Sequence, residues 1–439
     1  MNSKIKATLR KFLSVVLAAL TVFGCGGAAF AAGSDASGTV NGVDWVYTSA
    51  DKTLVLSGSG TLGEDVADFG LFGGSWVAEH VKIGADVNIT TGRVFENFDF
   101  VDEYEVDANN KYLCNPDGVL MDKDKTVLIK YPAGSKEFSF YTVPDTVKTI
   151  SYRAFEFSSA LKTIFLNDGL ETIENFAFDN CGNLLYITIP GTVTSMGKGV
   201  LAQCNLLNKV TIEEGVTAIP EDAFDRCRSL ETVNLPDSLT TIGDIAFFGC
   251  TKLKTLKLPK NLQTFTDSPG RNFGGLNIAL TVDPENQYFS TDDLGVLYNK
   301  DKTLLYYCPN LPYTFDYTVR CDLNKYAFKG CENLRNVDIA YNLRAIPTYA
   351  FNGCKNLNTV TLPATLQRVD GAAFDSSLNT VNYRGTEELW KLITIDSYDN
   401  SAIKSANVVY NYSEEEEPEE ITFTFDRSKS TVTITGAAL

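Results

Sequence analysis

The sequence predicts a solenoid of short stacked coils, a mainly β or α/β fold with a parallel sheet along one face. Its basis is a 23-residue repeat, in which Ala-Phe returns with a cysteine three places after the phenylalanine. A fixed period between 20 and 50 residues is typical of solenoids, because one coil cannot bury its apolar side without neighbours. The ladder positions are Phe155, Phe178, Phe224, Phe247, Phe328, Phe351 and Phe374, with Cys181, Cys204, Cys227, Cys250, Cys331 and Cys354.

Residues 177–199 show how one coil is built. Leu184, Ile187 and Ile189 follow the spacing of a short strand with one buried face, and Pro190 then removes a backbone donor and ends the strand. The segment after the proline is expected to lead back through a turn. We therefore expect about ten coils whose strands form the parallel sheet, with the phenylalanine and cysteine ladders filling the core behind it.

The cysteines are predicted to be buried, reduced thiols. A secreted chain with 10 cysteines suggests disulfides, but a fixed repeat position is better explained by a small buried hydrophobic side chain. Ser158 occupies the same position in the first regular coil. Cys308 and Cys321 lie outside the ladder and are the one pair that we suspect of forming a disulfide.

No metal or cofactor site is expected. A metal site would need Cys-x-x-Cys pairs or nearby histidines, and the only histidine is His80. The same composition disfavours a Ser-His-Asp or Cys-His arrangement. The net charge of -17 without a basic cluster excludes a nucleic-acid partner.

Two similar insertions interrupt the repeat. Residues 106–132 resemble residues 282–309, and each contains a polar turn of the Asp/Asn-Lys-Asp-Lys type between two apolar runs. We expect β-hairpins near 107–132 and 283–309. A cation could bind the acidic turn, but the favoured interpretation is a simple turn.

The ends of the coils need caps, because an open solenoid exposes its core. Residues 32–80 are predicted to form an N-terminal β cap module, followed by the solenoid at 81–412. Its C-terminal cap, 384–412, combines a short helix at 386–393 with a closing strand at 407–412, and Trp390 is expected to pack inside it.

The first 31 residues resemble a secretory signal peptide, with basic residues before an apolar run and a small-residue cleavage site at Ala29-Phe30-Ala31. The alternative is lipoprotein processing, which would place a lipid anchor on Cys25. Either way we expect a secreted or extracellular surface protein, and no later run is long enough for a transmembrane segment.

Residues 413–420 form an acidic linker, and residues 421–439 are predicted to be a partial second cap-like module. The segment 423–436 resembles 45–58 position by position. This repetition is the basis of one functional alternative, a structural spacer in a surface array.

At the level of the whole repeat, Cys227–Phe247 (CRSLETVNLPDSLTTIGDIAF) resembles the consensus of the BspA-like bacterial surface proteins, which have 23-residue leucine-rich repeats of the Treponema pallidum type. The resemblance covers residues 81 to 412. It implies a right-handed leucine-rich-repeat coil displayed outside the cell, which binds a protein or glycan on host or microbial surfaces. The family has no shared catalytic residues to transfer to this chain.

The candidate binding surface is the outward face of the strands in the N-terminal coils. Most outward positions carry short polar side chains, so the large apolar ones stand out as a contact site. An alternative is that the hairpin at 106–132 folds over this end and buries them. An enzyme using two carboxylates is a further, less favoured hypothesis. The candidate residues are Phe165, Leu185, Tyr186, Thr188, Thr211 and Asn234.

Overall fold

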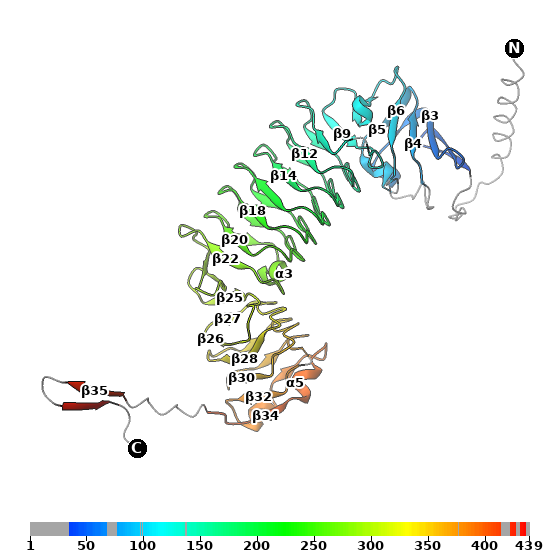
Figure 1. Cartoon of the computed structure of the whole chain (residues 1–439). Helices are drawn as coiled ribbons and strands as arrows, with labels where there is room; N and C mark the ends of the chain where they lie inside the picture. Colours follow the sequence, from blue (N-terminus) through cyan, green and yellow to red (C-terminus); the bar gives the residue numbers. More distant parts are fainter. Residues whose placement is uncertain are drawn as a thin grey trace, which may run out of the picture. The chain divides into compact units, whose positions relative to one another are not determined.

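The computed structural model describes residues 35–67, 77–96, 98, 100–136, 138–375, 377–413, 422–426 and 431–435 (Figure 1). The chain divides into two compact units. The first combines Met1–Pro312 with Leu323–Cys331, and the second combines Tyr313–Asp322 with Glu332–Leu439. The predicted signal peptide, Cys25 and most of the acidic linker lie outside the described residues.

The predicted fold class is confirmed, because the described residues form a parallel-strand β-solenoid with little helix. The structure has about 15 turns, more than the ten expected from the repeat. The additional turns carry strands without the Ala-Phe signature, and this is why the repeat alone missed them. They include β4 (His80–Ile83), β10 (Phe140–Thr142) and β26 (Phe315–Val319), and β34 (Asn407–Val409) lies within the predicted closing strand.

In the first unit, the longer strands of successive coils pair in parallel and at a constant register. Ile187 pairs with Val210, which in turn pairs with Val233, so each step along the sheet is one repeat. Alternate side chains therefore point into the core. After β10 the strands are β12 (Thr163–Phe165), β14 (Tyr186–Ile189), β16 (Lys209–Ile212) and β18 (Thr232–Asn234), and β20 (Thr255–Leu258) pairs with β22 (Ala279–Val282).

A second series of parallel strands lies where we expected the chain to lead back through a turn, and the repeat did not predict these strands. Its strands have two residues each, which is too short for an alternating pattern to show in the sequence. Thr172 pairs with Thr149 on one side and with Ser195 on the other. The strands β11 (Thr149–Ile150), β13 (Thr172–Ile173) and β15 (Ser195–Met196) pair in one sheet, and β17 (Ala218–Ile219), β19 (Thr241–Ile242) and β21 (Thr264–Phe265) form a separate three-stranded sheet.

The ladder phenylalanines stack inside the coils. The ring centroids of Phe155 and Phe178 are 5.2 Å apart, and those of Phe224 and Phe247 are 5.3 Å apart. Tyr131 continues the stack past the first ladder residue, with its ring 5.2 Å from that of Phe155. All four phenylalanines are fully buried.

The ladder cysteines are buried free thiols, and each links its coil to the one before. The Sγ of Cys204 donates to the carbonyl of Phe178 at 3.2 Å, and Cys227 repeats this contact to Leu201 at 3.1 Å. Burial raises the pKa of the Cys227 thiol well above its ordinary value. Neither Cys308 nor Cys321 forms a disulfide, so the suspected bond is absent.

The residue before each Ala-Phe pair has a left-handed backbone. Gly199 fills the equivalent position, before Val200-Leu201, with φ of 62°, whereas Ile245 precedes an Ala-Phe pair with φ of 45°. Glycine adopts such angles without steric cost, but a β-branched side chain does not. The position therefore carries local strain wherever isoleucine occupies it.

Replacing Ile245 by glycine is expected to stabilise the protein by about 1 kcal/mol, because the left-handed strain disappears. Ile245→Val is the control, since valine keeps the branched Cβ and should not stabilise. Urea unfolding of the three proteins measures the difference. Equal midpoints for all three would contradict a strained backbone at this position.

The N-terminal cap is a sheet with its own core. The hairpin of β2 (Val43–Thr48) and β3 (Thr53–Leu62) is flanked by β1 (Ala36–Val40) on one side and by β4 on the other. The sheet continues to β6 (Glu103–Val106), and β5 (Asp86–Ile89) pairs with the end of β3. Two short helical segments complete the region, α2 (Glu64–Ala67) and the 3₁₀ helix η1 (Gly92–Phe95).

Antiparallel strands occupy both predicted insertions. The first has β7 (Leu113–Cys114), the 3₁₀ turn η2 (Pro116–Gly118), β8 (Leu120–Asp122) and β9 (Val127–Lys130); the second has β23 (Phe289–Thr291), β24 (Leu297–Asn299) and β25 (Leu304–Tyr307). In the first, Asp122 Oδ1 accepts from the backbone N–H groups of Thr126 and Val127 at 2.7 and 2.6 Å. This carboxylate therefore closes the turn.

The coils on either side of each insertion contact one another directly. Across the first, the backbone N–H of Gly92 donates to Ser151 Oγ at 3.1 Å. Across the second, Ser268 Oγ donates to the carbonyl of Lys325 at 2.7 Å, next to the short helix α3 (Pro269–Phe273). We call these two contacts the bridging contacts.

The second unit has the same coil architecture. Its main sheet runs in the order β26, β28 (Leu334–Ile339), β30 (Thr359–Leu362), β32 (Thr380–Tyr383) and β34, and the short strands are β29 (Ala345–Ile346), β31 (Arg368–Val369) and β33 (Thr394–Ile395). The two-residue strand β27 (Asp322–Leu323) lies where the chain passes from one unit to the other. Helices α4 (Glu387–Trp390) and α5 (Ser401–Ser405) precede β34. The ring of Trp390 packs edge-to-face on Tyr383 at 5.2 Å.

The described tail is one hairpin, β35 (Thr422–Asp426) with β36 (Thr431–Thr435). Its register pairs Phe423 with Ile434, which matches the pairing of Trp45 with Leu56 in the N-terminal cap. Within the described residues, no helix combines the length and apolar character needed to cross a membrane.

Candidate binding surface

The predicted surface residues lie on the outward face of the first main sheet. Phe165 is the last residue of β12, Tyr186 is the first residue of β14, and Leu185 comes just before it. The strands are roughly 4.8 Å apart. These side chains therefore lie within two coils of one another.

Phe140 belongs to the same cluster, although the sequence analysis did not identify it. It pairs with Thr163, and Thr163 pairs with Tyr186, so the two aromatic residues flank one threonine across three strands. Thr163 is only 7% exposed, whereas Phe140 is 57% exposed. Phe140 precedes Tyr186 by two repeat lengths in the sequence, and this spacing could have identified it as an outward strand residue.

We call Phe140, Phe165, Leu185 and Tyr186 the aromatic patch. Phe165 is 52% exposed and Tyr186 is 51% exposed, so the inserted hairpin does not bury them. That alternative was wrong. Large apolar side chains at half exposure on an otherwise polar sheet are costly in water, and this favours a contact role.

The polar candidates extend the same face across the next strands. Thr188 pairs with Thr211, and Thr211 pairs with Asn234. The amide of Asn234 donates to Thr211 Oγ1 at 3.2 Å, so these two side chains already bond to one another. Of the three polar candidates, only Thr188 lies beside the aromatic patch.

A shallow hollow of about 120 Å³ borders the patch at the C-terminal ends of β12 and β14. Phe165, Tyr186 and Thr188 line one part of it, and the carboxylates of Asp168 and Glu213 line another. The hollow thus combines apolar surface with hydrogen-bond acceptors. This combination suits recognition of a partner that presents both apolar groups and donors.

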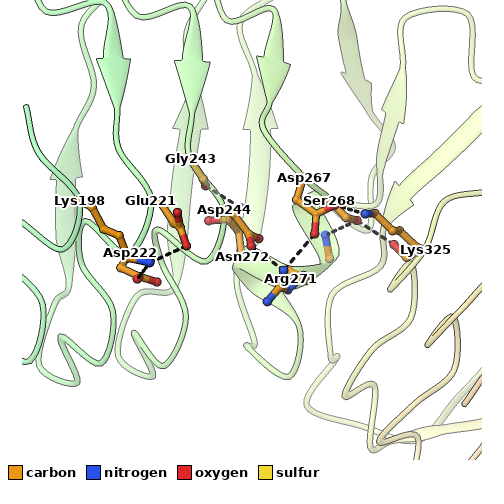
Figure 2. A network of polar contacts seen from close by, with 11 residues as sticks. Lys198, Glu221, Asp222, Gly243, Asp244, Asp267, Ser268, Arg271, Asn272 and Lys325 are labelled. Atoms are coloured by element: carbon orange, nitrogen blue, oxygen red, sulfur yellow. Dashed lines mark hydrogen bonds and ion pairs between the residues drawn. The ribbon is translucent and has the colours of Figure 1, made fainter.

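A second polar feature of the first unit is a network of charged side chains on the turns between coils (Figure 2). Lys198 bonds to Glu221 and Asp222 at 2.8 and 3.0 Å, one coil further on. Arg271 bonds to Asp244 at 2.5 Å and to Asp267 at 3.1 Å. All four of these carboxylates thus pair with Lys198 or Arg271. Because Lys198 and Arg271 each pair with an acid of a neighbouring coil, the network links the coils to one another.

The network also contributes to the second bridging contact. Asp267 accepts from both Arg271 and Lys325, the residue whose carbonyl is bonded to Ser268. Burial alone would raise the pKa of Asp267, but these two hydrogen bonds hold that pKa below its usual range. The carboxylate therefore stays ionised and paired.

Asp179 differs, because it is buried and forms no salt bridge within the described residues. Gln203 Nε2 approaches Asp179 Oδ1 at 3.4 Å, and only 8% of the residue is exposed. Burial raises the pKa of Asp179 to about 6, from an ordinary value of 3.8. The folded protein therefore binds a proton here that the unfolded chain releases above about pH 4.

Asp179→Asn is expected to stabilise the protein at pH 7.5 but not at pH 4. The raised pKa means that the wild-type side chain favours folding below its unfolded pKa and loses this contribution as the pH rises through about 6. The effect of Asp179→Asn on the free energy of unfolding should be about 3 kcal/mol more favourable at pH 7.5 than at pH 4. Asp145→Asn, at an exposed position, is the control for both pH values. An identical effect of Asp179→Asn at pH 4 and pH 7.5 would disprove the assignment.

The described residues contain no group of three or more histidine, cysteine, aspartate and glutamate side chains that could hold a metal ion. His80 lies on β4 at intermediate exposure, in register with Glu103.

A family model described as "BspA type Leucine rich repeat region" matches the chain in six copies, at residues 133–254, 217–269 and 304–415. No curated protein matches the chain. The matches together cover more than half of the sequence.

Several solved structures are similar to the chain. A leucine rich cell surface protein from Faecalibacterium prausnitzii is 19% identical, with 87% of this chain and 96% of that chain covered and a TM-score of 0.49. The pneumococcal vaccine antigen PcpA is 19% identical, with coverages of 88% and 89% and a TM-score of 0.45. The leucine rich repeat protein of T. pallidum is 16% identical, with coverages of 50% and 91% and a TM-score of 0.26.

Proposed function

Because the chain belongs to the BspA-type leucine-rich repeat family, we propose that it is an extracellular binding protein without catalytic activity whose aromatic patch contacts the partner. The observation that carries the proposal is the exposure of Phe140, Phe165 and Tyr186 on three successive strands. Aromatic side chains on a rigid sheet provide contact area at little entropic cost, which is why they are enriched at interfaces. The partner is a protein or glycan of a host or microbial surface.

The proposed location outside the cell rests on the predicted signal peptide at residues 1–31. Cleavage after Ala31 would release the chain, whereas processing at Cys25 would attach it to a membrane through a lipid. Mass spectrometry of the N-terminus of the mature protein distinguishes these two routes.

A binding scan of the full mature chain against host matrix proteins and bacterial glycans tests the proposal directly. Once a partner is found, the double variant Phe165→Ser and Tyr186→Ser is expected to weaken its binding at least tenfold. Both side chains are half exposed, so the fold should remain intact. Surface plasmon resonance measures the affinity.

The matched control is the pair Thr232→Ser and Thr255→Ser, at exposed positions of β18 and β20, two or more strands beyond β14. It should leave the affinity within about twofold. An unchanged affinity for the aromatic double variant would move the contact to the hairpins or to another face.

The second candidate function is a structural spacer in a surface array. The shared register of the tail hairpin and the N-terminal cap hairpin favours it, because it indicates two copies of one module in a single chain. A spacer would bind none of the partners in the scan, so the same experiment separates the two functions.

A further inference from the structure

A separate cavity of about 330 Å³ lies in the second unit, at the C-terminal ends of β28 and β30. Its lining combines apolar residues with a tyrosine, an asparagine, a threonine and an arginine. The lining residues are Ile339, Ala340, Tyr341, Asn342, Pro363, Ala364, Thr365 and Arg384.

The register of the strands explains how this space arises. Asp338 pairs with Thr361, and Leu362 pairs with Tyr383, so Ala340, Pro363 and Arg384 occupy the same position in three successive coils. A small alanine in the first coil, with Ala364 in the second, leaves space beside the strand ends. The long side chain of Arg384 forms the third wall.

Arg384 is held in place by contacts that reach back across two strands. Its Nη1 donates to Asp338 Oδ1 at 2.7 Å and to the carbonyl of Ile339 at 3.2 Å. The side chains of the ion pair remain 27% and 23% exposed. The guanidinium is therefore positioned before any ligand arrives, and its charge is balanced by the carboxylate.

Two polar side chains of the lining, those of Tyr341 and Asn342, form no hydrogen bond within the described residues. Tyr341 is 42% exposed. Thr365 Oγ1 donates to the carbonyl of Leu343 at 3.1 Å. The cavity thus presents donors and acceptors next to the exposed apolar side chains of Ala340 and Ala364.

We propose that this cavity binds a single neutral sugar residue. A pyranose ring has one apolar C–H face, which suits the exposed Ala340 and Ala364, and adjacent hydroxyls that both donate and accept, which suits Asn342 and Tyr341. The balanced ion pair supplies no net charge for a free anion. The volume lies at the lower end of ligand pockets, which fits one ring better than a peptide segment.

Saturation-transfer NMR on the full mature chain tests the proposal with galactose, glucose, mannose and N-acetylglucosamine, and with glucuronate as the acidic comparator. We expect transfer to at least one neutral sugar at millimolar concentration. Ala364→Trp fills the cavity from an exposed position and should weaken binding at least tenfold. Asn342→Ala should weaken it at least fivefold.

Ala218→Trp is the matched control, since it adds the same bulky side chain at an exposed position of the first unit. Both tryptophan variants should unfold at the wild-type urea midpoint. The proposal is overturned if no neutral sugar shows transfer, if Ala364→Trp binds as well as Ala218→Trp, or if glucuronate binds more tightly than every neutral sugar. Phe165→Ser with Tyr186→Ser should leave sugar binding unchanged, so this site and the aromatic patch are tested separately.

Discussion

Replacing Phe224 by alanine is expected to lower the free energy of unfolding by about 3–5 kcal/mol, the range observed for a buried aromatic side chain. Phe224 is fully buried, and its ring lies 5.3 Å from that of Phe247 in the next coil. The neighbouring coils are held in register by both parallel sheets, so they have little freedom to close around the missing ring. Urea unfolding followed by circular dichroism measures the loss.

Thr211→Ala is the matched control for this prediction, because Thr211 lies on the outward face of the same coil. It removes one exposed contact with Asn234 and should cost less than about 0.5 kcal/mol. Comparable losses for the two variants would show that burial inside the coil does not dominate its stability.

The second large effect is expected from Gly270→Ala, which should cost about 3 kcal/mol or more. A Cβ at this position would lie 2.2 Å from the carbonyl oxygen of Tyr326, and this is a backbone atom that cannot rotate away. Gly270 also lies beside Ser268, whose hydroxyl makes the second bridging contact. The variant should therefore separate the coils on either side of the hairpin.

Gly182→Ala provides the comparison, since a Cβ there meets no atom within 4 Å. It should be neutral within about 0.5 kcal/mol. Gly92→Ala repeats the experiment at the first bridging contact, where the added Cβ would lie 2.2 Å from the carbonyl oxygen of Tyr152. A mild effect of both Gly92→Ala and Gly270→Ala would mean that the coils tolerate a wider spacing.

Much of the fold could be predicted because the repeat encodes packing directly. Phe178 and Cys181 recur at one position since each rung of a stacked core has the same neighbours above and below. The prediction of a disulfide between Cys308 and Cys321 was wrong for a related reason. Both thiols are buried in the fold, and their place outside the ladder was no evidence for pairing.

The remaining features depend on interactions that a single strand does not encode. Strand β13 has only two residues, and it forms because β11 and β15 supply partners on both sides. Phe140 was missed because its coil lacks Ala-Phe, although it pairs with Thr163 like any other outward strand residue. The cavity beside Arg384 needs three coils at once, and no local pattern marks it.

The second bridging contact implies that the turn of the second inserted hairpin can be replaced. Ser268 joins the flanking coils without using a hairpin residue, and the side-chain hydrogen bonds of the turn between β24 and β25 stay within its own insertion, so this turn can change in length and composition. Such a site accepts foreign sequence at small energetic cost, because loop length enters stability only logarithmically. This turn is therefore a place to graft an epitope or a reporter tag onto the protein, and a place where evolution can diversify it.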